Sequence, residues 1–236
     1  MALVACPVPG KQKAIDLCNA FIAGAPKDAE GFVFYGVKES NVAAWRRVQN
    51  MEATFYYIDN SYFDPNRGTH FRVTRNRIQH TGEGRTTGER FARTGLRIKP
   101  WRNGDSYTLI IEQSDDHMRY VAKTPGTFYR QAKHLQLTQR TRIRRWSCNK
   151  PVLMESFMRD LENASRLLTY SSAAAVMATL AGIPVDCSDE CAAFSIIPFK
   201  EPDDRLRWAG VLADNEFTWA ELKDGTAWRT LHPGAA

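Results

Sequence analysis

The chain has 236 residues, of which 43% are hydrophobic and 25% are charged, and its formal net charge is +6. This composition is that of an ordinary globular protein of one large domain or two small ones, and it excludes a disordered, collagen-like or coiled-coil chain. No stretch approaches the roughly 18 consecutive apolar residues of a membrane-spanning helix, so we expect no contact with a membrane.

The N-terminal part of the chain alternates strands and helices. Short apolar or aromatic runs predict strands, and apolar residues at helical spacing predict helices. The predicted strands are 2–7, 31–37 and 53–59, and the predicted helices are 11–25 and 41–48, the second with Asn41 as its N-cap. Such an alternation is typical of a parallel sheet with crossover helices.

Residues 60–103 form a different region, rich in Gly, Arg and Thr, in which only 70–74 reads as a strand. Long ordered loops of this kind are uncommon unless they have a function. The alternation then resumes. The predicted strands are 106–111, 141–146, 166–170 and 184–187, and the predicted helices are 127–137, 151–164, 171–181, 203–213 and 218–231.

We therefore predict the α/β class, with two small Rossmann-like β/α domains over 1–103 and 104–236. The carboxyl ends of parallel strands and the helix N-termini face the cleft between two such domains, so this cleft is the default ligand site.

Cysteine usage and the N-terminus indicate a cytoplasmic protein. The five Cys are scattered and odd in number, unlike a disulfide framework. The N-terminal residues lack the basic region of a signal peptide. The sequence gives no role for the loop from Cys187 to Cys191 beyond a turn.

Positive charge is concentrated in two segments. Residues 67–102 and 130–150 together carry +15, and the remaining chain carries −9. Basic segments on an otherwise acidic chain favour a polyanionic partner, either nucleic acid or clustered phosphates. A solvated, Arg-rich loop would give the same pattern.

The most informative local pattern runs from Leu168 to Val185. A strand ends at Tyr170, and a helix is predicted to begin at Ser171-Ser172 and to continue with small residues. Free backbone N–H groups, two hydroxyls and the positive end of a helix can bind an anion. Alternatively, Ser171 only caps the helix and the alanines only pack against the sheet.

This segment resembles the donor-binding half of GT-B-type glycosyltransferases, in particular capsule-synthesis transferases and phage-encoded relatives. The shared features are a strand, a Ser pair, small residues and then Leu-Ala-Gly-Ile-Pro-Val. Three more segments resemble the phage relatives: 55–63 (Phe-Tyr-Tyr-Ile-Asp-Asn-Ser-Tyr-Phe), 71–76 and 212–228. The resemblance implies a minimal GT-B-like fold with an acceptor-side N-terminal domain and a nucleotide-sugar-binding C-terminal domain.

In that family the Ser pair binds the diphosphate of a nucleotide sugar. By position, the resemblance implies donor contacts at Gln113, Ser114, Arg144, Lys150, Tyr170, Ser171, Ser172 and Ala173. The donor expected first is a UDP-sugar. A helix N-terminus with Arg and Lys can stabilise the leaving diphosphate, so we expect no obligatory metal.

An inverting transferase also needs a base that takes the proton of the acceptor hydroxyl. Asp59 is the first candidate because it ends the third predicted strand, and Asn60 beside it could orient the acceptor. His70 is the second candidate. Asp59-Asn60 is equally consistent with a simple turn after a strand.

The basic region suggests DNA as the acceptor, since Arg can meet phosphates and interleaved aromatic residues can stack on bases. The acceptor expected is the hydroxyl of a hydroxymethylated pyrimidine, such as 5-hydroxymethylcytosine, in phage DNA within the host cytoplasm. The residues expected to contact DNA are Asn60, Arg67, Arg72, Arg75, Arg77, Arg85, Arg90 and Arg93. The alternatives are a transferase of capsule or surface glycan and a non-catalytic DNA-binding protein of the same fold.

Overall fold

The computed structural model describes residues 2–36, 38–64, 68–102, 106–121, 140–145, 152–197 and 201–234. The chain forms two compact units. Unit 1 consists of 1–78, 119–122 and 214–236, and unit 2 of 79–118 and 123–213. The C-terminal residues thus return to the unit that contains the N-terminus. This differs from the sequence prediction, which placed a single boundary at residue 103.

Unit 1 is built on a five-stranded sheet in the order β1-β2-β3-β4-β9. The strands are β1 (Leu3–Pro7), β2 (Gly31–Tyr35), β3 (Phe55–Asn60), β4 (His70–Arg75) and β9 (Glu216–Thr218). β1, β2 and β3 are parallel, as predicted, whereas β4 runs antiparallel to both β3 and β9.

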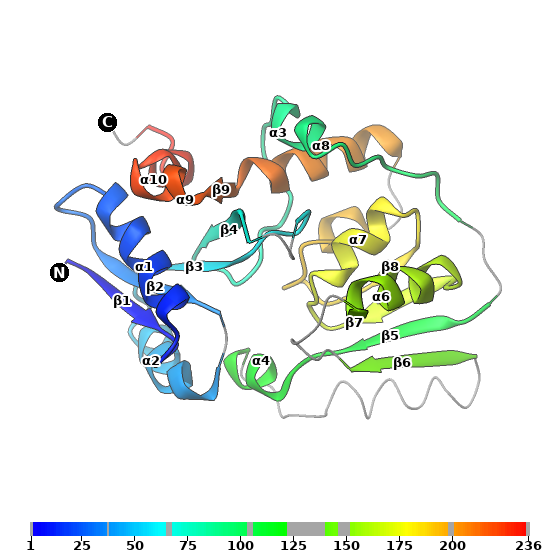
Figure 1. Cartoon of the computed structure of the whole chain (residues 1–236), viewed down its shortest axis with the longest axis horizontal. Helices are drawn as coiled ribbons and strands as arrows, with labels where there is room; N and C mark the ends of the chain where they lie inside the picture. Colours follow the sequence, from blue (N-terminus) through cyan, green and yellow to red (C-terminus); the bar gives the residue numbers. More distant parts are fainter. Residues whose placement is uncertain are drawn as a thin grey trace. The chain divides into compact units, whose positions relative to one another are not determined.

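Both faces of this sheet are covered, which explains why its central strands are apolar almost throughout. The helices of unit 1 are α1 (Gln12–Gly24), α2 (Glu39–Asn50), α9 (Trp219–Lys223) and α10 (Thr226–Leu231). Because side chains alternate along a strand, Tyr56 of β3 packs with Phe21 of α1 and Trp228 of α10, whereas Phe55 packs with Trp45 of α2. In Figure 1, α1 lies beside α9 and α10.

Unit 2 contains a four-stranded parallel sheet in the order β6-β5-β7-β8. Its strands are β5 (Thr108–Glu112), β6 (Thr141–Arg145), β7 (Arg166–Thr169) and β8 (Val185–Asp186). Its helices are α3 (Glu89–Arg93), α6 (Val152–Glu162), α7 (Ala174–Leu180), the 3₁₀ helix η1 (Phe194–Ile196) and α8 (Pro202–Asp214). The short α4 (Asp115–Tyr120) begins in unit 2, and its last two residues belong to unit 1.

Several predicted details are corrected by the structure. Asn41 is not the N-cap of α2: it lies three residues inside, where its side chain accepts a hydrogen bond from the N–H of Lys38, the true N-cap. The predicted helix 218–231 is two helices, because Gly225 adopts φ +83° between them. The predicted helix 127–137 lies outside the described residues.

Among the described residues, no helix combines the length and the apolar character that crossing a membrane requires.

Candidate functional site

The strand order of unit 2 singles out one position at the carboxyl edge of its sheet. From β5 the chain goes to β6 on one side and then returns to β7 on the other side of β5. Open parallel sheets bind ligands at such a switch point, beyond the carboxyl ends of the two strands. Here Gln113 follows β5, and Ser171 and Ser172 follow β7. The sequence prediction of donor contacts at these residues therefore falls on the switch point.

The Gln113 side chain joins the two strand ends. When its amide is oriented by the hydrogen-bond network, the Gln113 side-chain oxygen accepts from the N–H groups of Ser172 (2.6 Å) and Ser171 (3.1 Å) and from the Thr169 hydroxyl (3.3 Å). The sequence analysis expected free N–H groups at this point for a phosphate. That expectation is corrected, because a side-chain oxygen of the chain itself already occupies them.

Ser171 is held at each of its polar groups. Its side chain is buried, and its hydroxyl lies 2.6 Å from Nε2 of His117. Its carbonyl oxygen accepts from the Gln79 amide, whose oxygen in turn accepts from the N–H of Ala192 at 3.0 Å. Ser171 thus fixes the loop after β7, and it is not the residue that caps α7.

Ser172 lies just before Ala173, the N-cap of α7, and its side chain bonds to the first turn of the helix. α7 begins at Ala174, three residues later than predicted, and the Ser172 hydroxyl accepts from the Ala174 N–H at 3.2 Å. Ser172 and Ala173 are half-buried, as is Tyr170, whose hydroxyl donates to Glu190. Burial, and to a smaller extent the nearby negative charge of Glu190, raises the pKa of Tyr170 to about 12, so its hydroxyl stays protonated.

We refer to Gln79, Gln113, His117, Ser171 and Ser172 as the strand-end cluster. Gln79 and His117 were missed by the sequence analysis. A weak local signal exists for His117. Ser114 follows β5 directly before α4, and its hydroxyl accepts from the His117 N–H in the first turn of this helix at 3.2 Å. Gln79 carries no such signal, because its partners are about a hundred residues away in sequence.

The loop from Cys187 to Cys191 contacts the backbone that follows β7. The N–H and hydroxyl of Ser188 both bond to the Tyr170 carbonyl (2.9 and 2.8 Å), and the Cys191 thiol lies 3.8 Å from the Ser172 carbonyl. The pKa of Cys187 is raised, mainly by a hydrogen bond with Cys191 and also by burial. Both residues are free thiols, and no group of three or more metal-ligating side chains occurs among the described residues.

Arg144 has a different place from the one predicted. Its guanidinium bonds to Asp160 and Ser156 of α6, both at 2.8 Å, and its side chain is 13% exposed. Asp160 also pairs with Arg142 at 2.7 Å. Arg144 therefore ties β6 to α6, which differs from the predicted phosphate contact. Lys150 lies outside the described residues.

In unit 1 the candidate base Asp59 is the last residue but one of β3, which ends at Asn60, one residue later than predicted. Its carboxylate pairs with Arg72 of the adjacent strand at 2.6 Å and accepts from the Tyr57 hydroxyl (3.3 Å) and from the Asn60 N–H (2.8 Å). Arg72 is 6% exposed, and it also bonds to the Asn60 carbonyl at 2.9 Å. The prediction that Arg72 contacts DNA is wrong for this structure, because a buried guanidinium offers no phosphate contact.

A buried acid that the sequence analysis missed lies beside this ion pair. Glu216 of β9 accepts from the Ser61 hydroxyl at 2.5 Å and from the Tyr62 N–H, and it is 5% exposed. Burial raises the pKa of Glu216 to about 7, although both hydrogen bonds and Arg72 act in the opposite direction. Glu216 thus fixes the loop that follows β3.

Asn60 and His70 lie near the same edge of the unit 1 sheet. The Asn60 side-chain oxygen accepts from the Tyr35 hydroxyl at 3.2 Å and from Lys13 at 3.5 Å. His70 is half-buried at the start of β4, with Nδ1 3.0 Å from the Thr69 hydroxyl. The roles of Asp59, Asn60 and His70 toward an acceptor stay predictions.

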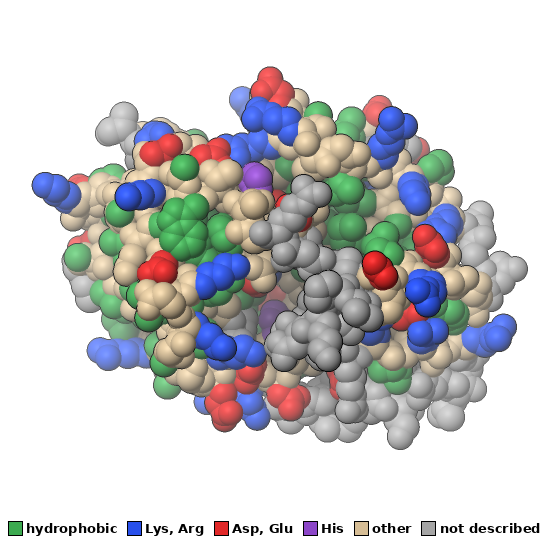
Figure 2. Space-filling view, viewed as in Figure 1, with side chains coloured by type: hydrophobic (Ala, Val, Ile, Leu, Met, Phe, Trp, Pro, Cys, Tyr) green, Lys and Arg blue, Asp and Glu red, His purple; other side chains and the backbone are tan. Residues whose placement is uncertain are grey.

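The remaining arginines predicted to contact DNA divide between the two units. Arg75 and Arg77 are exposed in unit 1, whereas Arg85 and Arg93 are exposed and Arg90 is half-buried in unit 2. In the face shown in Figure 2, Lys and Arg side chains are interspersed with Asp and Glu rather than gathered over one element. Arg67 lies outside the described residues.

Comparison with known proteins yields matches among solved structures alone. No family model matches the chain, and no curated protein matches it significantly. KpsC from Thermosulfurimonas dismutans, a beta Kdo 2,4 transferase, superposes with a TM-score of 0.52 at 12% identity, covering 92% of each chain. The beta Kdo 2,7 transferase of the same KpsC gives 0.50 at 9% identity, covering 96% of this chain and 99% of the other. The α/β fold of the GT-B glycosyltransferase type is therefore confirmed, and identities this low show the fold alone.

Proposed function

We propose that the chain is a glycosyltransferase that moves a sugar from a nucleotide sugar to an acceptor hydroxyl, with unit 2 binding the donor. The observation that carries the proposal is the strand-end cluster at the switch point of the unit 2 sheet, in a fold shared with two Kdo transferases. Fold alone does not determine activity. The cluster adds a site, because polar groups of two strand ends converge where open sheets bind ligands.

The proposed donor is a nucleotide sugar, and a UDP-sugar is the one to test first. Ser172 and Ala173 are half-buried in the loop after β7, and Ser114 is exposed after β5. A diphosphate that reaches the Ser171 and Ser172 N–H groups has to take the place of the Gln113 side-chain oxygen. An oxygen held by two consecutive N–H groups marks a position that suits an anionic oxygen.

The first acceptor we propose is the hydroxymethyl group of a modified pyrimidine in DNA. Support comes from the +15 charge of the two basic segments and from the exposure of Arg75, Arg77, Arg85 and Arg93. Asp59 is the proposed base. A duplex substrate would have to extrude the target base before transfer.

A glycan acceptor, as in capsule or surface polysaccharide, is the second candidate. It is favoured by the two solved structures, both of which are Kdo transferases by name.

A transfer assay tests the proposal directly. The full chain is incubated with a panel of nucleotide sugars, including UDP-sugars and a nucleotide-activated Kdo, and with separate acceptors. These are DNA containing 5-hydroxymethylcytosine or 5-hydroxymethyluracil, unmodified DNA, and oligosaccharides with free hydroxyls. Mass spectrometry of nucleosides and glycans reads the product, and a sugar-sized mass gain on one acceptor class identifies both substrates.

The outcomes separate the candidates. A gain on the hydroxymethyl bases alone supports the DNA acceptor, and a gain on the oligosaccharides alone supports the glycan acceptor. No gain with any donor, together with DNA binding whose affinity falls steeply with salt, indicates a binding protein without transferase activity. No gain and no DNA binding contradict both candidates.

A further inference from the structure

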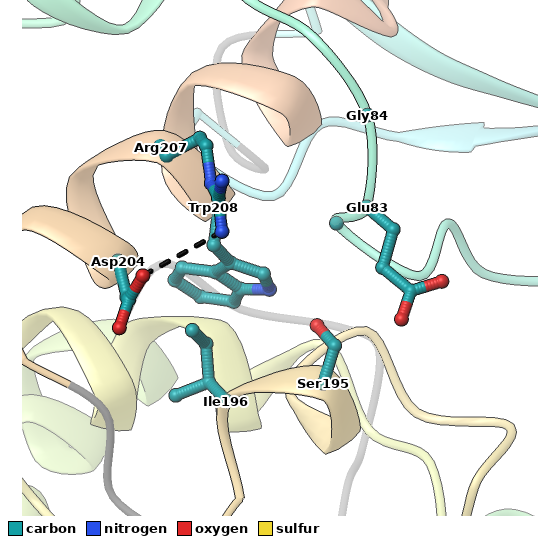
Figure 3. Close-up of a pocket in the computed structure, with 8 residues that line it drawn as sticks. Glu83, Gly84, Ser195, Ile196, Asp204, Arg207 and Trp208 are labelled. Atoms are coloured by element: carbon teal, nitrogen blue, oxygen red, sulfur yellow. Dashed lines mark ion pairs between the residues drawn. The ribbon is translucent and has the colours of Figure 1, made fainter.

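Unit 2 contains a cavity that the strand-end cluster does not use. The cavity has a volume of about 220 Å³. It is lined by Gly82, Glu83, Gly84, Ser195, Ile196, Asp204, Arg207 and Trp208. These residues come from the segment after β4, from η1 and from the first turns of α8. Figure 3 shows the polar side chains arranged around the indole of Trp208.

The floor of the cavity is apolar and tightly packed. The Trp208 side chain is 2% exposed, and its indole N–H donates to the Ala192 carbonyl at 2.7 Å. Gly82 packs directly on the indole, since a Cβ at this position would lie 2.0 Å from Cδ1 of Trp208. Ile196, which is 4% exposed, completes the floor. Because Trp208 and Ile196 are almost fully buried, the floor offers little apolar surface and no hydrogen-bond donor of its own.

The rim is polar and loosely held. Asp204 and Arg207 of α8 form a pair at 3.5 Å with side chains 41% and 67% exposed (Figure 3). Such an exposed pair contributes little to stability, so both groups can turn to a ligand at small cost. Across the cavity, the carboxylate of the exposed Glu83 has no hydrogen-bond or ion-pair partner within the described part of the chain. The Ser195 hydroxyl donates to the Thr81 carbonyl at 2.6 Å, which leaves its oxygen as an acceptor.

The size and charge of the cavity restrict its ligand. Its volume is below the roughly 300–1,000 Å³ of pockets that hold drug-sized ligands, so it suits a single ring and not a whole nucleotide. Two carboxylates and one guanidinium give the rim a charge of −1, which disfavours phosphate and carboxylate groups. The polar groups around this small cavity, which are acceptors on Glu83, Asp204 and Ser195 and a donor on Arg207, match a ring with several hydroxyls. We propose that this cavity binds one saccharide unit that carries no anionic group.

This proposal goes beyond the transferase activity, because saccharide binding can be measured without transfer. It also discriminates among substrates. Kdo is an acidic sugar, so the rim would select against it, whereas the two solved structures of this fold are Kdo transferases. The saccharide that occupies the cavity in this chain is therefore expected to be neutral or amino-bearing.

The test is a titration of the ¹⁵N-labelled full chain with glucose, N-acetylglucosamine, glucosamine and glucuronic acid, followed by NMR. We expect at least one of the first three to shift the backbone amide signals of Gly82, Gly84 and Ser195 in a saturable way. Hydrogen bonds to charged groups are stronger than those to neutral groups. Glu83→Gln combined with Asp204→Asn should therefore raise the Kd about tenfold or more. Asp203→Asn, one residue outside the cavity on the same helix turn, should leave it unchanged.

Three results would overturn the proposal: no saturable shift with any of the three sugars, equal Kd values for the double variant and Asp203→Asn, or tighter binding of glucuronic acid than of glucose. Glu83 and Asp204 are partly or fully exposed, so both variants should fold, as the unchanged signals of the remaining chain would show. Saccharide binding without transfer would contradict the transferase proposal and leave the cavity assignment standing.

Discussion

Glu216 gives the chain a pH dependence of stability that can be worked out from the structure. Burial raises the pKa of its carboxyl from the ordinary value of 4.5 to about 7. The folded chain therefore binds this proton more tightly than the unfolded chain does. Stability gained from the bound proton is fully present below about pH 4.5, and it is lost as the pH rises through about 7.

The two pKa values set the size of the effect. At about 1.4 kcal/mol per pKa unit, the free energy of unfolding should fall by about 3 kcal/mol between these pH limits because of this group. Glu216→Gln removes the titration and keeps the shape, and its amide oxygen can still accept from the Tyr62 N–H. The variant should therefore lack this part of the pH dependence.

Urea unfolding of both proteins at several pH values measures the effect. The difference in unfolding free energy between the native chain and Glu216→Gln should itself change by about 3 kcal/mol across the window, because groups common to both cancel. Glu52→Gln, at an exposed glutamate of the same unit, should give a constant difference. A constant difference for Glu216→Gln as well would refute the burial argument.

Four further variants, two of them with matched controls, test the packing and the proposed donor site of unit 2. Gly82→Ala places a Cβ against Trp208 and should cost about 1–3 kcal/mol more than Gly88→Ala, which has the same φ of +74° but open space around it; equal losses in urea unfolding would contradict this. Asp160→Asn leaves Arg144 without its carboxylate and should destabilise the chain by about 3 kcal/mol, whereas the exposed Asp203→Asn should change stability by less than about 0.5 kcal/mol. Ser172→Ala should weaken binding of a nucleotide sugar by about 1–3 kcal/mol if its hydroxyl bonds to phosphate, while Ser171→Ala should lower stability by removing the partner of His117. Calorimetric titration with the donor separates these two effects.

The sequence predicted the parallel strands well because their burial pattern is local. β1, β2 and β3 are short apolar runs between turn residues, and β5 and β7 follow the same rule. The α/β class and the position of the donor loop after β7 follow from these strands. Asn41 was misplaced because a polar residue near a helix start can serve as cap or as third residue, and only the backbone decides.

The parts that could not be predicted depend on contacts between distant residues. β9 has three residues, and its partner β4 lies more than a hundred residues earlier, so no local pattern shows that the C-terminus rejoins unit 1. The same holds for Gln79 and Gln113. Single glutamines carry no motif, and their role in fixing Ser171 exists only once the strands have assembled.

The role of Asp59 can be decided by measuring stability and turnover on the same variant. A carboxylate has about four lone-pair sites, and those of Asp59 receive Arg72, Tyr57 and the Asn60 N–H. A base must keep one site for the acceptor proton. Asp59→Asn keeps the shape and removes the charge opposite the buried Arg72, so it should destabilise unit 1 whatever the reaction.

If Asp59 is also the base, kcat should collapse at a temperature where Asp59→Asn is still folded, and donor binding should stay unchanged. Tyr57→Phe supplies the matched control, because it removes one hydrogen bond to Asp59 and leaves the carboxylate itself in place. Turnover that falls only in proportion to the unfolded fraction, in both variants alike, would make Asp59 the ion-pair partner of Arg72 and leave the base to be sought at His70.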